Sequence, residues 1–293
     1  MTAGEPGPAW RTIPALTRFN LSLVVAFSAL AGFVCFRHAA DHRAWAAFAG
    51  VLLLACGASA LNQYQERDSD AQMDRTKNRP LPMRQMSGRL AVGIAALLIL
   101  AGAALLYFES TTFAASLGIF TLLWYNGIYT PLKRRTRFAV LVGAITGALP
   151  PLIGYTAAGG PPVSVCLVFS LFMFLWQVSH FQLLLIKYGR QYERAGFPAM
   201  VSPTNEKGLR ISVLFWMTAT VGGALGLLAV RIVSGWVATA VLIAASVLFL
   251  TFSCARLVRV RQTTGVAPLL RSLYIYQGIV FLLIIGSGVL NPN

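Results

Sequence analysis

The sequence predicts an all-α protein that crosses a membrane nine times, and three observations lead to this fold class. First, 57% of the 293 residues are apolar and only 11% are charged, whereas soluble proteins have about 25% charged residues. Second, the apolar residues form long runs of about twenty, the length that a helix needs to cross a bilayer. Third, basic residues gather in alternate loops. These runs are much longer than barrel strands, so we expect every span to be helical.

Each span is expected where an apolar run is long enough to cross the hydrocarbon core. The expected ranges are 16–36, 44–64, 90–108, 112–130, 138–158, 162–186, 210–230, 235–255 and 269–290. They form one transmembrane domain over residues 16–290, after a cytosolic lead-in over residues 1–15. This lead-in lacks the cleavage site of a secretory signal, so we expect it to remain in the mature protein.

The basic residues also predict the orientation, because Lys and Arg in short loops favour the cytosolic side. With the N-terminus in the cytosol, only Arg37, Arg43 and Arg231 of the 24 Lys and Arg residues lie on the opposite side. The net charge of +15 then mostly reflects topology, and we expect no nucleic-acid partner. The four cysteines lack metal-binding spacing and are expected to pack as small core residues.

Acidic residues crowd the end of the second expected span. Asn62, Glu66, Asp70 and Asp74 are spaced by four, so neighbouring members lie on nearly the same face of a continuing helix. Like charges on one face repel, and a cation should compensate them. Carboxylate oxygens suit Mg²⁺, which fills its remaining positions with water and phosphate. We therefore predict a Mg²⁺ site at Glu66, Asp70 and Asp74.

Basic residues follow this acidic run directly. Arg75, Lys77 and Arg79 are suited to phosphate oxygens. Carboxylates for Mg²⁺ beside donors for phosphate indicate a diphosphate ligand. Asp68 lies on the other side of the helix from Glu66 and is expected to pair with one of these cations. The alternative is a solvated loop of mixed charge.

Residues 62–82 resemble the first aspartate-rich motif of the UbiA superfamily of intramembrane prenyltransferases, most closely its protoheme IX farnesyltransferase (heme O synthase) branch. The branch pattern is N-x-Y-x-D-R-D-x-D-x-x-M-x-R-T-x-x-R-P. Its matches are Asn62, Tyr64, Arg67, Asp68, Asp70, Met73, Arg75, Thr76, Arg79 and Pro80. Glu66 departs from the branch aspartate; it keeps the charge but moves the carboxylate outward by a methylene group.

A second motif, after the fourth expected span, is similar to the branch pattern Y-T-x-L-K-R-x-T. Lys133 and Arg134 are expected to bind diphosphate oxygens, where cations also stabilise a leaving group. Arg135 and Arg137 either join them or only anchor the loop on the cytosolic side.

The fifth expected span begins beyond that loop and is similar to the branch pattern G-A-x-x-G-A-x-P-P-x-x-G. Pro150 and Pro151 are expected to kink or unwind it. Gly143, Gly147 and Gly154 are expected to let neighbouring helices or a flat macrocycle approach closely.

A third motif ends the sixth expected span and resembles the branch patterns W-Q-x-P-H-F and D-Y-x-x-A-G-x-P. His180 lies in a strongly apolar stretch, which marks it as a functional candidate. A neutral imidazole can ligate heme iron or act as a base. The alternative is a hydrogen bond to a facing helix. We expect His180, Gln177 and Tyr192 to bind the acceptor.

The third motif departs from the branch at two positions. Gln191 stands in place of an aspartate, and Ser179 in place of a proline. Neither Gln191 nor the lone Glu193 forms an obvious second metal site. Glu193 lies about 200° from Gln191 around a helix, so it can serve only if the segment is irregular.

The resemblance implies a UbiA-type bundle that uses Mg²⁺ to transfer farnesyl from farnesyl diphosphate to a vinyl carbon of heme B, giving heme O for terminal oxidases. It implies a bacterial or mitochondrial inner membrane and a downstream heme A synthase or oxidase assembly factor as partner. The expected catalytic residues are Asn62, Glu66, Asp70, Lys133 and His180. Aromatic residues that face the allylic cation, or only pack, are Trp124, Tyr125, Tyr129 and Phe181.

Two other functions stay open. A prenyltransferase for an aromatic quinone precursor would need the same donor site with a different acceptor pocket. A non-catalytic membrane protein that binds heme or isoprenoid would keep the same scaffold, and Gln191 favours it. The persistence of Asn62, Glu66, Asp70 and the following arginines favours an enzyme.

Overall fold

All regular structure in the described part of the chain is helical, as the composition predicts. The structure is a computed structural model that describes residues 9–136, 138–162, 164–198, 206–259 and 263–290. Its elements are α1 (Ala9–Thr17), α2 (Phe19–Arg37), α3 (His42–Asp70), α4 (Gly88–Glu109), α5 (Thr112–Leu122), η1 (Leu123–Tyr129), α6 (Thr130–Leu132), α7 (Ala139–Ala157), α8 (Ser164–Arg194), α9 (Glu206–Ala229), α10 (Trp236–Arg259), η2 (Thr263–Val266) and α11 (Ala267–Leu290).

Eight helices within the described residues are long and apolar enough to cross a membrane: α2, α3, α4, α7, α8, α9, α10 and α11. The fourth expected span, 112–130, is not among these eight; it is helical but not one regular α-helix. It begins as α5, passes through the π-helical segment η1 and ends as α6. A π-helical turn is wider than an α-helical one and is frequent at functional sites. The count of nine and the cytosolic N-terminus stay predictions.

The first expected span, 16–36, is broken near its start. α1 ends at Thr17, and Arg18, with a φ of 46°, turns the chain before α2 begins. Gln63 Nε2 on α3 donates hydrogen bonds to the carbonyls of Ala15 and Leu16, at 2.7 and 2.9 Å. These bonds satisfy carbonyls that the end of α1 leaves open. The first expected span is therefore confirmed as α2, but its first residues, 16 and 17, belong to α1, which packs against α3.

α2 and α7 touch through their backbones. A Cβ atom on Gly154 would lie 1.7 Å from the carbonyl oxygen of Ala29, and one on Gly32 would lie 2.0 Å from that of Pro151. The close approach expected at Gly154 is confirmed. α7 nevertheless runs unbroken through Pro150 and Pro151, so the expected unwinding is wrong. A membrane helix tolerates proline where protein packs against it, and α2 does so here.

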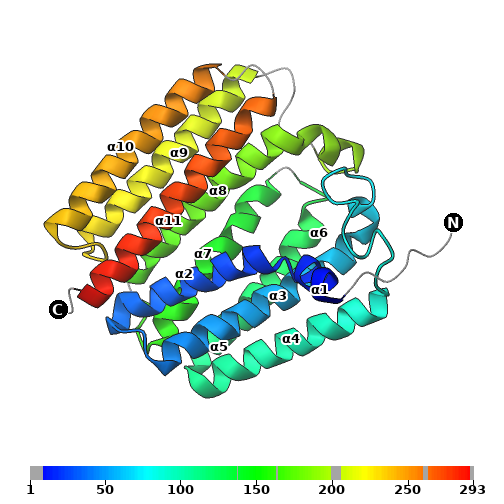
Figure 1. The fold of residues 1–293 in the computed structure, drawn as a ribbon, viewed down its shortest axis with the longest axis horizontal. Helices are drawn as coiled ribbons and strands as arrows, with labels where there is room; N and C mark the ends of the chain where they lie inside the picture. The colour runs from blue at the N-terminus through cyan, green and yellow to red at the C-terminus, as the bar shows by residue number, and fades with distance from the viewer. Residues whose placement is uncertain (1–8, 137, 163, 199–205, 260–262, 291–293) are drawn as a thin grey trace.

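The helices form two groups that face each other (Figure 1). One group contains α8, α9, α10 and α11 and shares a large apolar core. The other contains α2, α3, α4, α5 and α7, with α3 and α4 packed along each other. Cys56 and Cys166 are buried, but Cys254 is exposed on α10, the outermost helix of its group, so the expected core position is wrong for Cys254.

Candidate active site

A cavity of about 870 Å³ extends from the acidic end of α3 to α8 and α11. It brings together residues from all three sequence motifs. The expected site residues that line it are Glu66, Asp70, Arg75, Arg79, Lys133, Gln177, His180 and Tyr192. Its charged and aromatic parts are described below as the donor end (Glu66, Asp70, Arg75, Arg79 and Lys133) and the acceptor end (Trp176, Gln177, His180 and Tyr274).

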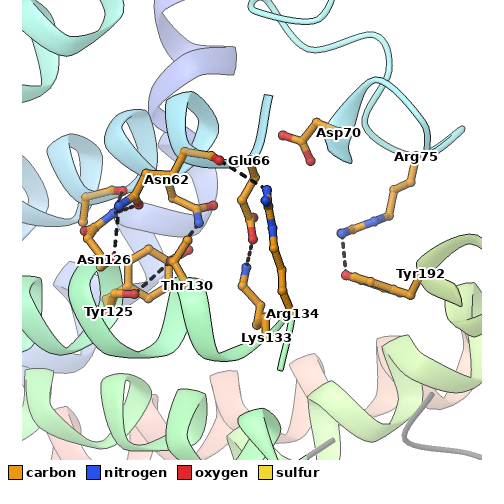
Figure 2. A network of polar contacts seen from close by, with 12 residues as sticks. Asn62, Glu66, Asp70, Arg75, Tyr125, Asn126, Thr130, Lys133, Arg134 and Tyr192 are labelled. Atoms are coloured by element: carbon orange, nitrogen blue, oxygen red, sulfur yellow. Dashed lines mark hydrogen bonds and ion pairs between the residues drawn. The ribbon is translucent and has the colours of Figure 1, made fainter. Parts of the chain in front are cut away.

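Glu66 and Lys133 form a buried ion pair at the donor end. Lys133 Nζ lies 2.6 Å from Glu66 Oε1, and the two side chains are 18% and 7% exposed. The two residues come from α3 and from the turn that follows α6, and they point toward each other in Figure 2. Burial alone would lower the pKa of Lys133, but the Glu66 carboxylate raises it above its ordinary value. Lys133 is therefore a fixed cation in the cavity wall.

Asp70 and Arg79 form a second buried ion pair. Arg79 Nη1 donates to Asp70 Oδ2 at 2.5 Å, and the Asp70 side chain is 1% exposed. Burial, together with the nearby charge of Arg18, lowers the pKa of Arg79 to about 10, so its guanidinium stays charged at neutral pH. The loop after α3 thus folds back and returns a cation to the last carboxylate of that helix.

Asp74 does not join Glu66 and Asp70. α3 ends at Asp70, and the Thr76 hydroxyl donates to the Asp70 carbonyl where the chain turns. Asp74 is exposed, and its pKa is lowered by a hydrogen bond of 2.6 Å from Lys77. No group of three His, Cys, Asp or Glu side chains in the described residues could hold a metal. The predicted set of Glu66, Asp70 and Asp74 is therefore wrong, because it needed a helix that continues.

Asp68 and Lys77 also lie elsewhere than expected. Asp68 is exposed and pairs with its neighbour Arg67 at 3.8 Å, not with a cation of the 75–79 run. Lys77 is half-exposed and bonded to Asp74, and it does not line the cavity. Of the three cations predicted to bind diphosphate here, Arg75 and Arg79 face the cavity.

Arg75 is held against the end of α8. Its Nη2 donates to the Tyr192 hydroxyl at 2.6 Å (Figure 2). Its guanidinium also lies over the rings of Tyr188 and Tyr192, 5.3 and 5.5 Å from their centroids. Its backbone N–H donates to Gln191 Oε1 at 3.2 Å. Gln191, at the position of the branch aspartate, therefore fastens the 71–87 loop to α8.

Glu193 is exposed and does not line the cavity. It could replace the branch aspartate only if the chain were irregular near it, but α8 continues as a regular helix to Arg194. The prediction of Glu193 as a second metal ligand is therefore wrong for this arrangement.

Amide side chains join α3 to the π-helical segment. Asn62 Nδ2 donates to Thr130 Oγ1 at 3.0 Å, while Gln65 and Asn126 exchange two hydrogen bonds of 3.1 Å (Figure 2). These contacts fix η1 and α6 beside α3 and so place Lys133 opposite Glu66. Asn62 itself is buried, and its Oδ1 has no hydrogen-bond partner.

The described cations that follow Lys133, Arg134 and Arg135, do not line the cavity. Arg134 is exposed and donates from Nη2 to the Gln65 carbonyl at 3.4 Å, so it braces the same junction. Arg135 is exposed as well, and Arg137 lies outside the described residues. Among the described residues of this run, Lys133 is the cation that lines the cavity.

The acceptor end is aromatic. His180 Nε2 and the Tyr274 hydroxyl are 2.7 Å apart, so the hydrogen bond to a facing helix, expected as an alternative, is present. The Trp176 ring lies parallel to His180, with centroids 5.3 Å apart and an angle of 6°. Gln177 rests on Gly147, where a Cβ atom would lie 2.8 Å from Gln177 Oε1. Glycine at 147 therefore makes room for a side chain of the site.

Aromatic rings connect the two ends. The ring of Tyr129 lies 4.9 Å from Lys133 Nζ and stacks with Phe181 at 6.1 Å, and Phe181 lies beside His180. Tyr125, Tyr129 and Phe181 line the cavity. Trp124 does not; its Nε1 donates to the Val142 carbonyl, so the interpretation as packing applies to it.

Arg18 and Tyr274 are cavity residues that the sequence motifs missed. Arg18 lies inside an expected span, where only the left-handed turn between α1 and α2 directs it to the cavity. Tyr274 lies in the last span, far from any motif. The sequence contained one signal that could have identified either residue, a charge inside an apolar run, and only Arg18 has it.

The fold and the site define a multi-pass membrane protein whose bundle encloses carboxylates and cations at one end and aromatic side chains at the other. The UbiA prenyltransferase family matches residues 20–275. The chain belongs to the UbiA prenyltransferase family.

Individual relatives agree with this assignment. The chain is 40% identical over 230 residues to the protoheme IX farnesyltransferase of Geobacter sulfurreducens. This match covers 76% of the chain and 84% of the relative. Its fold is similar to that of a digeranylgeranylglyceryl phosphate synthase, with a TM-score of 0.74, 15% identity and coverage of 96% and 98%. It is also similar to a UbiA homolog from Archaeoglobus fulgidus bound to GPP and Mg²⁺, with a TM-score of 0.66, 15% identity and coverage of 94% and 98%.

Proposed function

We propose that this protein transfers the farnesyl group of farnesyl diphosphate to a vinyl carbon of heme B and so produces heme O. The observation that carries the proposal is that one continuous cavity joins paired charges suited to a diphosphate with an aromatic end suited to a flat acceptor. The similarity to protoheme IX farnesyltransferase supports heme as that acceptor. A quinone precursor would leave the large aromatic end without a counterpart.

The donor end has oxygen atoms of the kind that Mg²⁺ prefers. The Glu66 and Asp70 carboxylates line the cavity one helical turn apart on α3, and Asn62 Oδ1, one turn before Glu66, is buried without a hydrogen-bond partner. We assign Asn62, Glu66 and Asp70 to hold the ion. When bound, Mg²⁺ would stabilise the charge of the departing diphosphate.

The cations of the chain would bind the remaining diphosphate oxygens. Lys133 and Arg75 line the cavity from opposite sides of the donor end, one after α6 and one held against α8. Positive charges fixed before the reaction lower the barrier to breaking the C–O bond, because they need no rearrangement as charge develops on the leaving group. Apolar side chains such as Leu54, Ile153 and Leu184 offer walls for the farnesyl chain.

The acceptor end would orient the vinyl group toward the farnesyl C1 carbon. The rings of Tyr129 and Phe181 lie between the two ends, where their faces can stabilise an allylic cation. The vinyl carbon donates its π electrons to C1, diphosphate leaves, and the cation that remains beside the porphyrin takes up water and releases a proton. Trp176 and Gln177 provide a flat surface and a polar contact for the macrocycle.

The setting follows from the same assignment. The several spanning helices make the chain a multi-pass membrane protein, and its bacterial relatives favour a bacterial inner membrane. A heme A synthase or an oxidase assembly factor, which would consume or deliver the product, is the partner that we propose.

The test supplies purified protein in lipid with farnesyl diphosphate, Mg²⁺ and either heme B or an aromatic acid, followed by mass analysis. We expect a heme product that has gained one farnesyl group and one water. A prenylated aromatic acid with unchanged heme would favour the quinone-precursor function. Binding of heme without any prenylated product would favour a non-catalytic protein.

A further inference from the structure

A hydrogen-bonded histidine and tyrosine join α8 to α11 at the acceptor end. His180 Nε2 lies 2.7 Å from the Tyr274 hydroxyl. Both residues line the cavity, yet Tyr274 is 46% exposed and His180 only 8% exposed. Tyr274 is thus the member of the pair that is accessible to a ligand or water, and His180 is buried next to it.

The surrounding packing fixes this pair. The Trp176 ring is parallel to His180, and Trp176 Nε1 donates at 3.1 Å to the carbonyl of Leu273, the neighbour of Tyr274. His180 Nδ1 is buried without a hydrogen-bond partner. A buried polar nitrogen without a partner is costly, and a catalytic role is one explanation for such a group. Because Nε2 contacts the Tyr274 hydroxyl and Nδ1 has no hydrogen-bond partner, Nε2 is the nitrogen through which His180 can exchange a proton.

The other proton acceptors of the cavity are occupied. Among the described side chains that line it, Glu66 and Asp70 are the carboxylates, and each is ion-paired at the donor end. His180 is the titratable base of the acceptor end. A proton released near the heme vinyl group thus has the Tyr274 hydroxyl and His180 as its nearest route.

We propose that Tyr274 and His180 form a proton relay for the water that adds to the farnesylated vinyl group, an inference that rests on the proposed function. The water oxygen forms a C–O bond to the cationic carbon. One water proton passes to the Tyr274 oxygen as the tyrosine proton passes to His180 Nε2. The products are the alcohol and a histidinium, which later releases its proton to solvent, and no electrons are gained or lost.

The relay determines which product forms. A carbocation that water does not capture loses a proton from the adjacent carbon and becomes an alkene. The relay favours capture because it removes the proton of the incoming water, and apolar walls leave few other bases nearby. The two products contain the same farnesyl group and differ by one water. Their ratio therefore reports the relay, while their sum reports the transfer of farnesyl.

The test compares the products of the wild type with those of Tyr274→Phe, by mass, with farnesyl diphosphate, Mg²⁺ and heme B. We expect Tyr274→Phe to form farnesylated heme with a ratio of hydrated to dehydrated product roughly 100-fold lower, the scale of general-base catalysis. The matched control is Tyr276→Phe, on the same helix, whose hydroxyl bonds Ser246 and does not line the cavity. The ratio should not change in this control.

His180→Asn provides a second variant, which is expected to shift the ratio in the same direction. If Tyr274→Phe does not elute as a folded protein, His180→Asn tests the relay in its place. An unchanged ratio in a folded variant, or the same shift in Tyr276→Phe, overturns the relay. A wild type that makes no farnesylated heme refutes the proposed function instead, so the two failures are distinct.

Discussion

The two ends of the cavity are held together by different forces. At the donor end, two buried ion pairs, Glu66 with Lys133 and Asp70 with Arg79, join α3 to segments that follow it in sequence. At the acceptor end, stacked rings and one hydrogen bond join α8 to α11. Removal of one member of a buried ion pair leaves an uncompensated charge, whereas an altered ring leaves a space. Donor-end substitutions should therefore affect both stability and catalysis, whereas acceptor-end substitutions should mainly affect the binding of the acceptor.

The largest effect is expected at Asp70. Asp70→Asn keeps the size of the side chain but removes the charge that faces Arg79 and that we assign to Mg²⁺. We expect kcat to fall by about 1,000-fold, as when a main electrostatic contribution is lost. Asp74→Asn is the matched control, because Asp74 is exposed and bonded to Lys77, and it should stay within about twofold of wild type.

Steady-state rates with saturating substrates check this pair of variants. A loss in Asp74→Asn as large as that in Asp70→Asn would restore the three-carboxylate set that the sequence predicted. Full activity in Asp70→Asn would remove Asp70 from the site.

The Glu66–Lys133 pair separates stability from catalysis. Lys133→Met should lower kcat by about 100-fold and destabilise the protein by about 3 kcal/mol, because it leaves Glu66 charged and buried. Glu66→Gln combined with Lys133→Met should recover most of the stability but none of the activity. Arg134→Met, at the exposed neighbour, should change the rate only a few-fold.

Thermal unfolding in detergent and turnover, measured on the same preparations, test this prediction. A double variant that is no more stable than Lys133→Met would show that the pair contributes no mutual compensation.

The sequence predicted the fold class and the three segments that meet at the cavity, because long apolar runs and clustered charges are local signals. It did not predict where the helices end. The position of Asp74 depended on the end of α3, and that of Arg18 on the turn after α1. The position of Tyr274 at the cavity depended on the contact between α8 and α11, which no local pattern encodes. Spacing thus predicted which segments meet, and only packing decided which side chains face the cavity.

A smaller effect is expected at the acceptor end. In Gly147→Ala the new Cβ atom would lie 2.8 Å from Gln177 Oε1, so the Gln177 side chain must move away from it. We expect the KM for heme B to rise about fivefold, equivalent to about 1 kcal/mol, with little change in the KM for farnesyl diphosphate. Gly93→Ala is the control, because nothing lies within 4 Å of its new Cβ atom. Equal changes in both KM values would contradict a separation of the two ends.

The smallest effect is expected at Gln191. Gln191→Ala removes one hydrogen bond to the Arg75 backbone, so the loop loses part of its attachment to α8. We expect the KM for farnesyl diphosphate to rise roughly threefold at constant kcat, the scale of one exposed hydrogen bond. Gln191→Asp should bring no gain, because Glu193 is exposed and does not line the cavity. A large gain in kcat from Gln191→Asp would reveal a second metal site.

A structure with a non-hydrolysable farnesyl diphosphate analogue, Mg²⁺ and heme B tests the division of the cavity most directly. We expect the diphosphate between Lys133 and Arg75, the metal against Glu66 and Asp70, and the porphyrin against Trp176 beside Tyr274. Heme bound outside the cavity, or a diphosphate at the aromatic end, would contradict this account.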